Sequence, residues 1–181
     1  MLNSKLQVIR ELLDLHGHVM YTGEPVTQLE HALQTALLAE THGASSELIA
    51  AAFLHDLGHM LNFQGATPTQ RGVDDAHQNV VKPFLQDVLP AAVLDPIRLH
   101  VDAKRCLCAI DPTYEDQLSD DSKRSLRLQG GIFNEEEVQH FLREPHAQDA
   151  MRLRRWDDLA KEAGLSTPSA DHYLGIIAGL A

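Results

Sequence analysis

The sequence predicts an all-α protein, and three features support this fold class. Apolar residues recur at helical spacing through most of the chain. No segment shows the alternation of apolar and polar residues that marks a half-buried strand. Helix-start residues such as Ser and Asn, and helix-end residues such as Gly, stand at the borders of the periodic segments. Without an internal repeat or a low-complexity linker, one domain over residues 1–181 is the simplest organisation.

The first half of the chain predicts three helices. Residues 4–15 carry apolar side chains at helical spacing and end near Gly17. Residues 23–43 form a second helix, with Pro25 near its first turn. Residues 48–60 are an almost continuous apolar run, which predicts a helix that is buried on all sides.

The second half continues in the same way after a loop at residues 62–72, which is rich in Gly and Pro. Pro83 lies inside the next periodic segment and is expected to kink it. Asn134 and Glu137 have the spacing of a capping box. The predicted helices are 74–89, 91–104, 120–129, 135–142, 146–163 and 169–179.

Composition excludes several classes of protein. With 181 residues, 44% of them hydrophobic and 23% charged, the chain is long enough for a real core. No apolar run approaches the roughly 18 residues of a membrane span, and the N-terminus lacks a secretory pattern, so we expect a cytoplasmic protein. The net charge of −11 argues against nucleic acid as a partner. Cys106 and Cys108 are too close for an ordinary disulfide and are expected to be structural thiols.

The pair His55-Asp56 lies in the predicted buried helix 48–60 and is the strongest sign of chemistry. A buried imidazole and a buried carboxylate are costly unless they are paired or bind a metal. Adjacent helix positions are about 100° apart, so both side chains are able to reach the same cavity. A carboxylate there can bridge two cations while the imidazole binds one. The pair therefore predicts a metal anchor.

Other candidate ligands occur singly. His31, His77 and His100 each lie in a segment that otherwise packs inward, and Asp157 lies late in the segment 146–163. Taken alone, a histidine on an apolar helix face is more often a hydrogen-bonded core residue than a ligand. Six histidines are neither candidate ligands nor part of the His55–His59 motif, and they are interpreted as surface or core residues: His16, His18, His42, His140, His146 and His172.

Taken together, the candidates form one set of nitrogen and oxygen ligands: His31, His55, Asp56, His77, His100 and Asp157. One metal cannot use all of them and keep room for chemistry, whereas two metals bridged by Asp56 can. Such ligands suit iron, manganese or zinc, and the residues alone leave that choice open.

In this order the residues resemble the His…His-Asp…Asp pattern of the HD-domain superfamily, and His77 and His100 resemble the extra ligands of its dinuclear branch. Within that branch the chain is similar to the phosphonate-cleaving oxygenases. The likeness runs from about residue 20 to 161. It is carried by Tyr21-Thr22-Gly23-Glu24, Gln28-Leu29-Glu30-His31 and residues 54–59, 100–105, 125–131 and 153–157.

The resemblance implies an HD-domain helical bundle with its metal-binding core over about residues 20–161. It implies two iron ions, as an Fe(II)/Fe(III) pair, and the use of O2 to cleave a C–P bond. The implied partner is a small organophosphonate, 1-hydroxy-2-aminoethylphosphonate or its N-trimethylated form. The products are then phosphate and glycine or glycine betaine. The sequence is compatible with a monomer or a small homo-oligomer.

The resemblance also implies roles around the metals. Tyr21 occupies an iron position until substrate displaces it, with Glu24 assisting; without the family, Tyr21 equally fits an aromatic residue at a helix entry. Lys104 lies one turn after His100 and is expected to meet the phosphonate, whereas the simpler interpretation is a solvated lysine. Three further residues are expected to bind substrate by similar spacing: His59, Ser125 and Gln129.

Asp74 and Asp75 depart from the family pattern. Two interpretations of them stay open: exposed loop carboxylates, or partners of a cationic nitrogen on the substrate.

Two other functions compete with the oxygenase. The first is an HD phosphohydrolase that uses a metal-activated water on a nucleotide or phosphate ester, and it needs neither O2 nor the Tyr21 and Glu24 gate. The second is a non-catalytic HD regulatory module. Modules of that kind usually lack ligands, whereas the set in this sequence is complete.

Overall fold

The computed structural model describes the whole chain except residues 22, 63–68, 75 and 181. Its described residues contain no β-strand, only an isolated bridge between Met20 and Thr27. The all-α prediction is confirmed. The helices are α1 (Leu2–His16), α2 (Gln28–Thr41), α3 (Ser46–Leu54), α4 (Leu57–Leu61), α5 (Gln78–Leu85), α6 (Ala91–Ile110), α7 (Tyr114–Gln117), α8 (Asp120–Leu128), α9 (Glu135–Leu142), α10 (Ala147–Leu159) and α11 (Ala170–Ala178), with a short 3-10 turn η1 (Thr69–Arg71).

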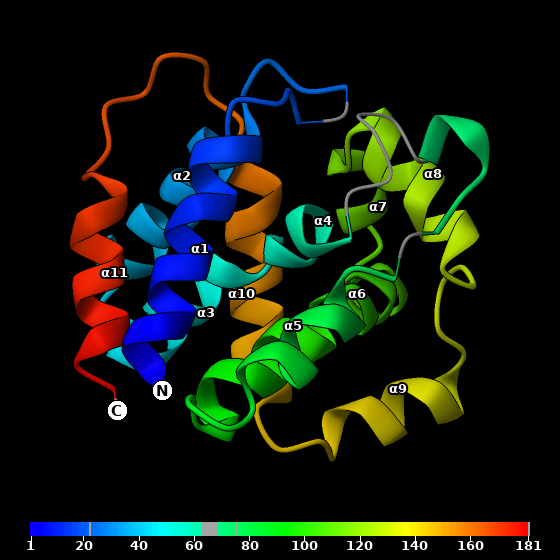
Figure 1. The fold of residues 1–181 in the computed structure, drawn as a ribbon. Helices are drawn as coiled ribbons and strands as arrows, with labels where there is room; N and C mark the ends of the chain where they lie inside the picture. Colours follow the sequence, from blue (N-terminus) through cyan, green and yellow to red (C-terminus); the bar gives the residue numbers. More distant parts are fainter. Residues whose placement is uncertain (22, 63–68, 75, 181) are drawn as a thin grey trace.

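Helices α6 and α10 pack directly on each other in the middle of the molecule. Helices α2 and α3 pair beside α10, and α5 runs along α6. Helix α11 covers α3 and lies beside α1, so the two ends of the chain come close together (Figure 1). Helix α9 packs on α6 and α10 on the side away from α1 and α11. The short helix α4 packs against α5 and α1.

The main core lies between α1, α2, α3, α4, α5, α6, α10 and α11. Every residue from 48 to 54 is buried, as the continuous apolar run predicts. Phe53 on α3 stacks on Tyr173 of α11 with ring centroids 5.3 Å apart. Smaller clusters form around Leu99 and Phe141, and around Tyr114 and Leu126. Burial of this apolar surface is the main force that holds the helices together.

Local side-chain bonds set the start of α2. The Thr27 hydroxyl accepts a hydrogen bond from Glu30 N–H at 3.2 Å, and the Glu30 carboxylate accepts one from Thr27 N–H at 2.7 Å. This capping box places the helix start at Gln28, so the predicted start at residue 23 is wrong. The residues before it form a turn in which Tyr21 N–H donates to the Val26 carbonyl at 2.8 Å. The predicted capping box of α9 is also present.

Other predicted bounds differ from the structure. Segments 74–89 and 146–163 contain the shorter helices α5 and α10, and η1 falls in the predicted loop at 62–72, most of which lies outside the described residues. Helix α7 was not predicted. Helix α6 continues past residue 104 and ends where Asp111 precedes Pro112, because a residue before proline disfavours helical backbone.

None of the helices in the described chain has the length and apolarity that crossing a bilayer requires. Cys106 and Cys108 are buried and form no disulfide. Burial raises the pKa of both thiols, which fits structural rather than reactive cysteines.

Candidate metal centre and active site

The His55-Asp56 pair lies at the break between α3 and α4, so the prediction of one continuous helix over 48–60 is wrong. His55 keeps helical backbone angles, whereas Asp56 has φ −99° and ψ 7° and redirects the chain into α4. Both side chains are buried. His55 Nε2 lies 3.3 Å from Asp56 Oδ2. The break thus places an imidazole and a carboxylate side by side in the interior.

Gly58 of α4 determines how closely His77 approaches this pair. A Cβ at position 58 would lie 2.0 Å from the His77 carbonyl oxygen, so a residue larger than glycine does not fit without a backbone shift. His77 is the N-cap of α5 rather than a residue within a helix, and it is buried. Its Nε2 lies 3.3 Å from Asp56 Oδ1.

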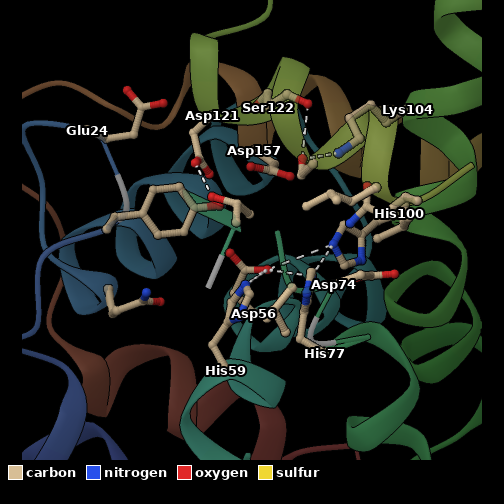
Figure 2. A pocket seen from close by; sticks show the side chains of 18 of the residues that line it. Glu24, Asp56, His59, Asp74, His77, His100, Lys104, Asp121, Ser122 and Asp157 are labelled. Carbon is tan, nitrogen blue, oxygen red and sulfur yellow. Dashed lines mark hydrogen bonds and ion pairs between the residues drawn. The ribbon is translucent and has the colours of Figure 1, made fainter. Parts of the chain in front are cut away.

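The structure brings the six predicted ligands together in two groups that share Asp56, and Figure 2 shows Asp56 between the neighbouring side chains. In the first group His31 Nε2 lies 3.2 Å from His55 Nε2, 3.3 Å from Asp157 Oδ1 and 3.5 Å from Asp56 Oδ2. In the second group His77 Nε2 lies 3.1 Å from His100 Nε2. His100 Nε2 is 3.8 Å from Asp56 Oδ1. One carboxylate therefore presents one oxygen to each group.

Backbone carbonyls fix which ring nitrogen of three histidines carries the proton. Nδ1 of His31 lies 2.9 Å from the Ala160 carbonyl, Nδ1 of His55 2.9 Å from that of Ala52, and Nδ1 of His100 2.6 Å from that of Ile97. A carbonyl only accepts, so each Nδ1 donates. Each Nε2 is therefore left with its lone pair directed at the group around Asp56, as a metal ligand requires.

This donor set fits metal ions. Two Nε2 atoms that face each other at 3.1 to 3.2 Å need a proton or a metal ion between them. Asp56 Oδ2 and Asp157 Oδ1 are buried and accept no hydrogen bond from the described residues. Unsatisfied buried carboxylate oxygens are costly, and a metal ion would satisfy them. His31, His55 and Asp157 lie close enough to share one ion, and so do Asp56, His59 and His77.

The electrostatics of the two groups point the same way. Burial alone would lower the pKa of His55, but Asp56 and Asp157 raise it to about 9, so without a metal ion its Nε2 carries a proton that a metal ion would replace. Burial alone would raise the pKa of Asp56, yet His55, His59 and His77 hold it well below its ordinary value. Burial and the neighbouring His77 lower the pKa of His100. The carboxylates thus stay ionised and attract positive charge to the centre.

Arg154 orients Asp157, and sequence reasoning missed it. Its Nη1 lies 2.7 Å from Asp157 Oδ2, which leaves Oδ1 facing His31. Burial alone would raise the pKa of Asp157, whereas Arg154 and nearby histidines keep it well below its ordinary value. Arg154 also pairs with Asp158, whose carboxylate accepts from the Tyr114 hydroxyl. The spacing of Arg154 to Asp157 and Asp158 on an inward-packing helix is a signal that could have found it.

Tyr21 lies over the first group. Its ring stacks on His31 with centroids 4.0 Å apart and planes at 14°. Burial, together with Asp56 and Asp157, raises the pKa of its hydroxyl well above the ordinary value. Its predicted neighbour in the motif, Thr22, lies outside the described residues.

Glu24, the other predicted gate residue, lines a cavity that lies beside the metal ligands. Its Oε1 accepts a hydrogen bond from Lys161 Nζ at 2.9 Å. Lys161 gave no sequence signal, because its partner lies 137 residues away along the chain.

The cavity beside the metal ligands also contains the predicted substrate-binding residues His59, Lys104, Ser125 and Gln129. Lys104 is 2% exposed, and its Nζ donates to the Ser125 hydroxyl at 2.7 Å (Figure 2). Burial lowers the Lys104 pKa to about 7. The Gln129 side-chain oxygen is buried and accepts no hydrogen bond from the described residues. The solvated-lysine alternative is wrong.

His59 lies nearer the metal groups than its predicted role suggests. Its ring stacks on His77 with centroids 3.9 Å apart, and its Nε2 is 3.7 Å from Asp56 Oδ1. Asp74 is exposed at the cavity rim, where its Oδ1 accepts from Ala76 N–H at 3.1 Å; Asp75 lies outside the described residues. His16 also lines the cavity, and no motif or spacing in the sequence singles it out.

Fold and site together define a class. Residues 29–128 match the HD domain family, and the chain belongs to this family.

Relatives with named activities are more specific. The chain is 44% identical over 164 residues to the hydroxymethylphosphonate dioxygenase of Gimesia maris, a match that covers 90% of this chain and 81% of that protein. It is 37% identical over 172 residues to the 1-hydroxy-2-(trimethylamino)ethylphosphonate dioxygenase (glycine-betaine-forming) of Leisingera caerulea, covering 95% and 88%. An uncharacterized protein of Acanthamoeba polyphaga mimivirus is 31% identical over 174 residues, covering 95% and 80%.

Proposed function

We propose that this protein is an O2-dependent diiron oxygenase that cleaves the C–P bond of a 1-hydroxyphosphonate. The observation that carries the proposal is the carboxylate of Asp56, whose two oxygens face two histidine groups beside a cavity that contains Lys104. The similarity to two phosphonate dioxygenases supports the same reaction.

Two iron ions would be held by the six residues described above, with Asp56 shared between them. His59 is a further candidate for the second ion, since it lies close to Asp56 and His77. Iron at these positions supplies the electrons and the open coordination positions that O2 chemistry requires.

The residues around the metals bind and orient the substrate. Lys104 and Ser125, already hydrogen-bonded to each other, offer an ammonium and a hydroxyl to the phosphonate oxygens. Gln129 offers a further polar group in the same cavity. Tyr21, stacked on His31, covers the first group and limits the access of water and O2 until substrate binds.

The atom balance of the reaction defines a test. A hydroxyphosphonate and one O2 give a carboxylate, inorganic phosphate and a proton. One oxygen atom from O2 enters the carboxylate and the other enters phosphate, while the C–P bond and the C1–H bond break. With the 2-amino substrate the carboxylate is glycine, and with the trimethylammonium substrate it is glycine betaine.

The experiment supplies iron-loaded protein with hydroxymethylphosphonate, 2-amino-1-hydroxyethylphosphonate or its N-trimethylated form. We expect O2 consumption equal to phosphate release, and one ¹⁸O atom in each product under ¹⁸O2. Release of phosphate from a phosphonate, nucleotide or phosphate ester without O2 would favour the phosphohydrolase alternative. Purified protein without iron, zinc or manganese would favour the regulatory module. Cytoplasmic location and a monomeric or small homo-oligomeric state stay predictions.

A further inference from the structure

The cavity has two ends of different chemistry. Lys104, paired with the Ser125 hydroxyl, lies at one end, and Glu24 lies on the opposite side of the view in Figure 2 with Asp157 and Asp56 between them. A phosphonate held by Lys104 directs the rest of the substrate away from the cationic end. Glu24 is therefore a residue that a cationic nitrogen on the substrate would approach.

The Glu24 carboxylate already has a cationic partner. Lys161 Nζ lies 2.9 Å from Glu24 Oε1 and also donates to the Ser119 hydroxyl at 3.3 Å. The side chains of the pair are only 14% and 11% exposed. A pair shielded in this way is screened less by salt than a surface pair.

The backbone on both sides of Lys161 is fixed to α2. The Ala160 carbonyl accepts from His31 Nδ1 at 2.9 Å. Glu162 exchanges two hydrogen bonds with the Gln34 side chain, at 2.7 and 3.0 Å. These bonds hold the backbone that carries Lys161 in place, and the bonds to Glu24 and Ser119 hold its side chain.

Other carboxylates that line the cavity are also engaged. Asp121 pairs with Arg124 at 2.9 Å, and Asp157 pairs with Arg154 at 2.7 Å. Asp56 lies within the histidine groups. Asp74 is exposed at the rim and accepts a backbone N–H. A substrate ammonium thus meets no described carboxylate in the interior that lacks a positive partner.

A quaternary ammonium group is commonly bound by the open faces of aromatic rings. Among the described residues that line the cavity, Tyr21 is the aromatic residue other than histidine, and its ring is stacked on His31. Apolar side chains line other parts of the cavity: Val19, Met60, Val73, Val101 and Leu128. Such a lining suits a small uncharged substituent.

We propose that Lys161 is a specificity-determining residue. By saturating Glu24 it selects a small hydroxyalkylphosphonate without a cationic nitrogen, of which hydroxymethylphosphonate is the simplest. A 2-ammonium group on the substrate would meet a Glu24 carboxylate that Lys161 already neutralises, so such a substrate is disfavoured. The inference rests on the proposed function and narrows its substrate class.

The test compares kcat/KM for hydroxymethylphosphonate with kcat/KM for 2-amino-1-hydroxyethylphosphonate, using iron-loaded protein and O2. Wild-type protein is expected to prefer hydroxymethylphosphonate. Lys161→Met frees the Glu24 carboxylate and shifts the ratio toward the amine by about tenfold, the effect of roughly one shielded ion pair. Lys161→Arg keeps the charge and the wild-type ratio. In the double variant Glu24→Gln/Lys161→Met the shift of the ratio toward the amine is lost, because the carboxylate that would bind the ammonium is absent.

Controls separate specificity from structure. Lys82→Met removes another ion-paired lysine, one whose partner, Asp95, does not line the cavity, and should leave the ratio unchanged. If Lys161 were purely structural, Lys161→Met would lower kcat/KM for both substrates by the same factor. That result would overturn the inference. The inference would also be overturned if the wild-type protein preferred the amine. It would be overturned as well if Asp74→Asn lowered kcat/KM for the amine alone. If neither phosphonate consumes O2 or releases phosphate, the proposed function itself falls, and the inference with it.

Discussion

At the scale of single residues, the cavity combines a buried lysine with a buried cluster of histidines and carboxylates. Lys104 is 2% exposed and bonds to a neutral hydroxyl, and no carboxylate of the described residues forms an ion pair with it. Burial therefore lowers its pKa from 10.5 to about 7. A bound phosphonate dianion would supply the missing negative charge and raise that pKa again.

This environment predicts how phosphonate binding depends on pH. Lys104 binds the phosphonate in its protonated form, so KM is expected to rise as the pH increases through about 7. The sign is opposite for stability: the unfolded chain holds this proton more tightly, so the Lys104 contribution to folding increases with pH between about 7 and 10.5.

Steady-state kinetics from pH 6 to 9 would check the prediction. Lys104→Met should raise KM roughly 10- to 100-fold near neutral pH, the range for hydrogen bonds to charged groups. It should also remove this part of the pH dependence and leave only the titration of the phosphonate. An unchanged KM in the variant would contradict the role of Lys104.

At the scale of secondary structure, two local features determine the geometry of the centre: a break between helices and a close contact between helices. The break between α3 and α4 places His55 next to Asp56, and the contact of Gly58 with the His77 backbone brings α5 against α4. His31 is held by the carbonyl of Ala160 at the end of α10, so α2 and α10 are joined at the first metal group. The centre is thus built where helix ends meet.

Gly58→Ala tests this contact. The added Cβ would meet the His77 carbonyl, so α4 and α5 must separate or the backbone must shift. Overpacking of this kind costs about 1 to 3 kcal/mol of unfolding free energy. We expect weaker binding of the second metal ion, measured by metal analysis after dialysis, while the first group keeps its ion. Gly175→Ala is the matched control, because nothing lies within 4 Å of a Cβ at that position. Full occupancy of both metals in Gly58→Ala would argue against the proposed second site.

At the scale of the whole molecule, the site joins most of the fold. Its candidate ligands come from α2, the α3–α4 junction, the start of α5, α6 and α10. Without a cation, the facing Nε2 atoms and the buried oxygens of Asp56 and Asp157 are poorly satisfied. Metal binding is therefore expected to contribute to the stability of the fold.

Metal removal should lower the melting temperature. Ligand linkage gives about 2.7 kcal/mol when free metal is 100 times its Kd, which corresponds to several degrees in Tm for a domain of this size. The measurement is thermal unfolding before and after chelation. In Asp56→Asn, which removes the shared charged ligand, chelation should change Tm much less. Equal melting temperatures of the wild-type protein with and without metal would show that the two histidine groups bind no metal ion that stabilises the fold.

The sequence by itself determined the features that depend on neighbours within a few residues. Helical periodicity and capping residues located most helices, the apolar run 48–60 indicated burial, and the spacing of Lys104 to His100 placed both at one cavity. Gly58 gave no hint of its contact with His77, and the interruption between α3 and α4 went unpredicted. Both depend on packing between helices.

Only the tertiary structure decided which distant residues meet. It set Asp157 beside His31, gave each Asp56 oxygen its own histidine group, and joined Lys161 to Glu24 across 137 residues of chain. The physical reason is that local propensity and side-chain spacing act over one or two helical turns. The partners of a buried charge, by contrast, are selected by how the helices pack, through the cost of leaving that charge unpaired. The proposed choice between a phosphonate with a cationic nitrogen and one without it lies in that second kind of contact.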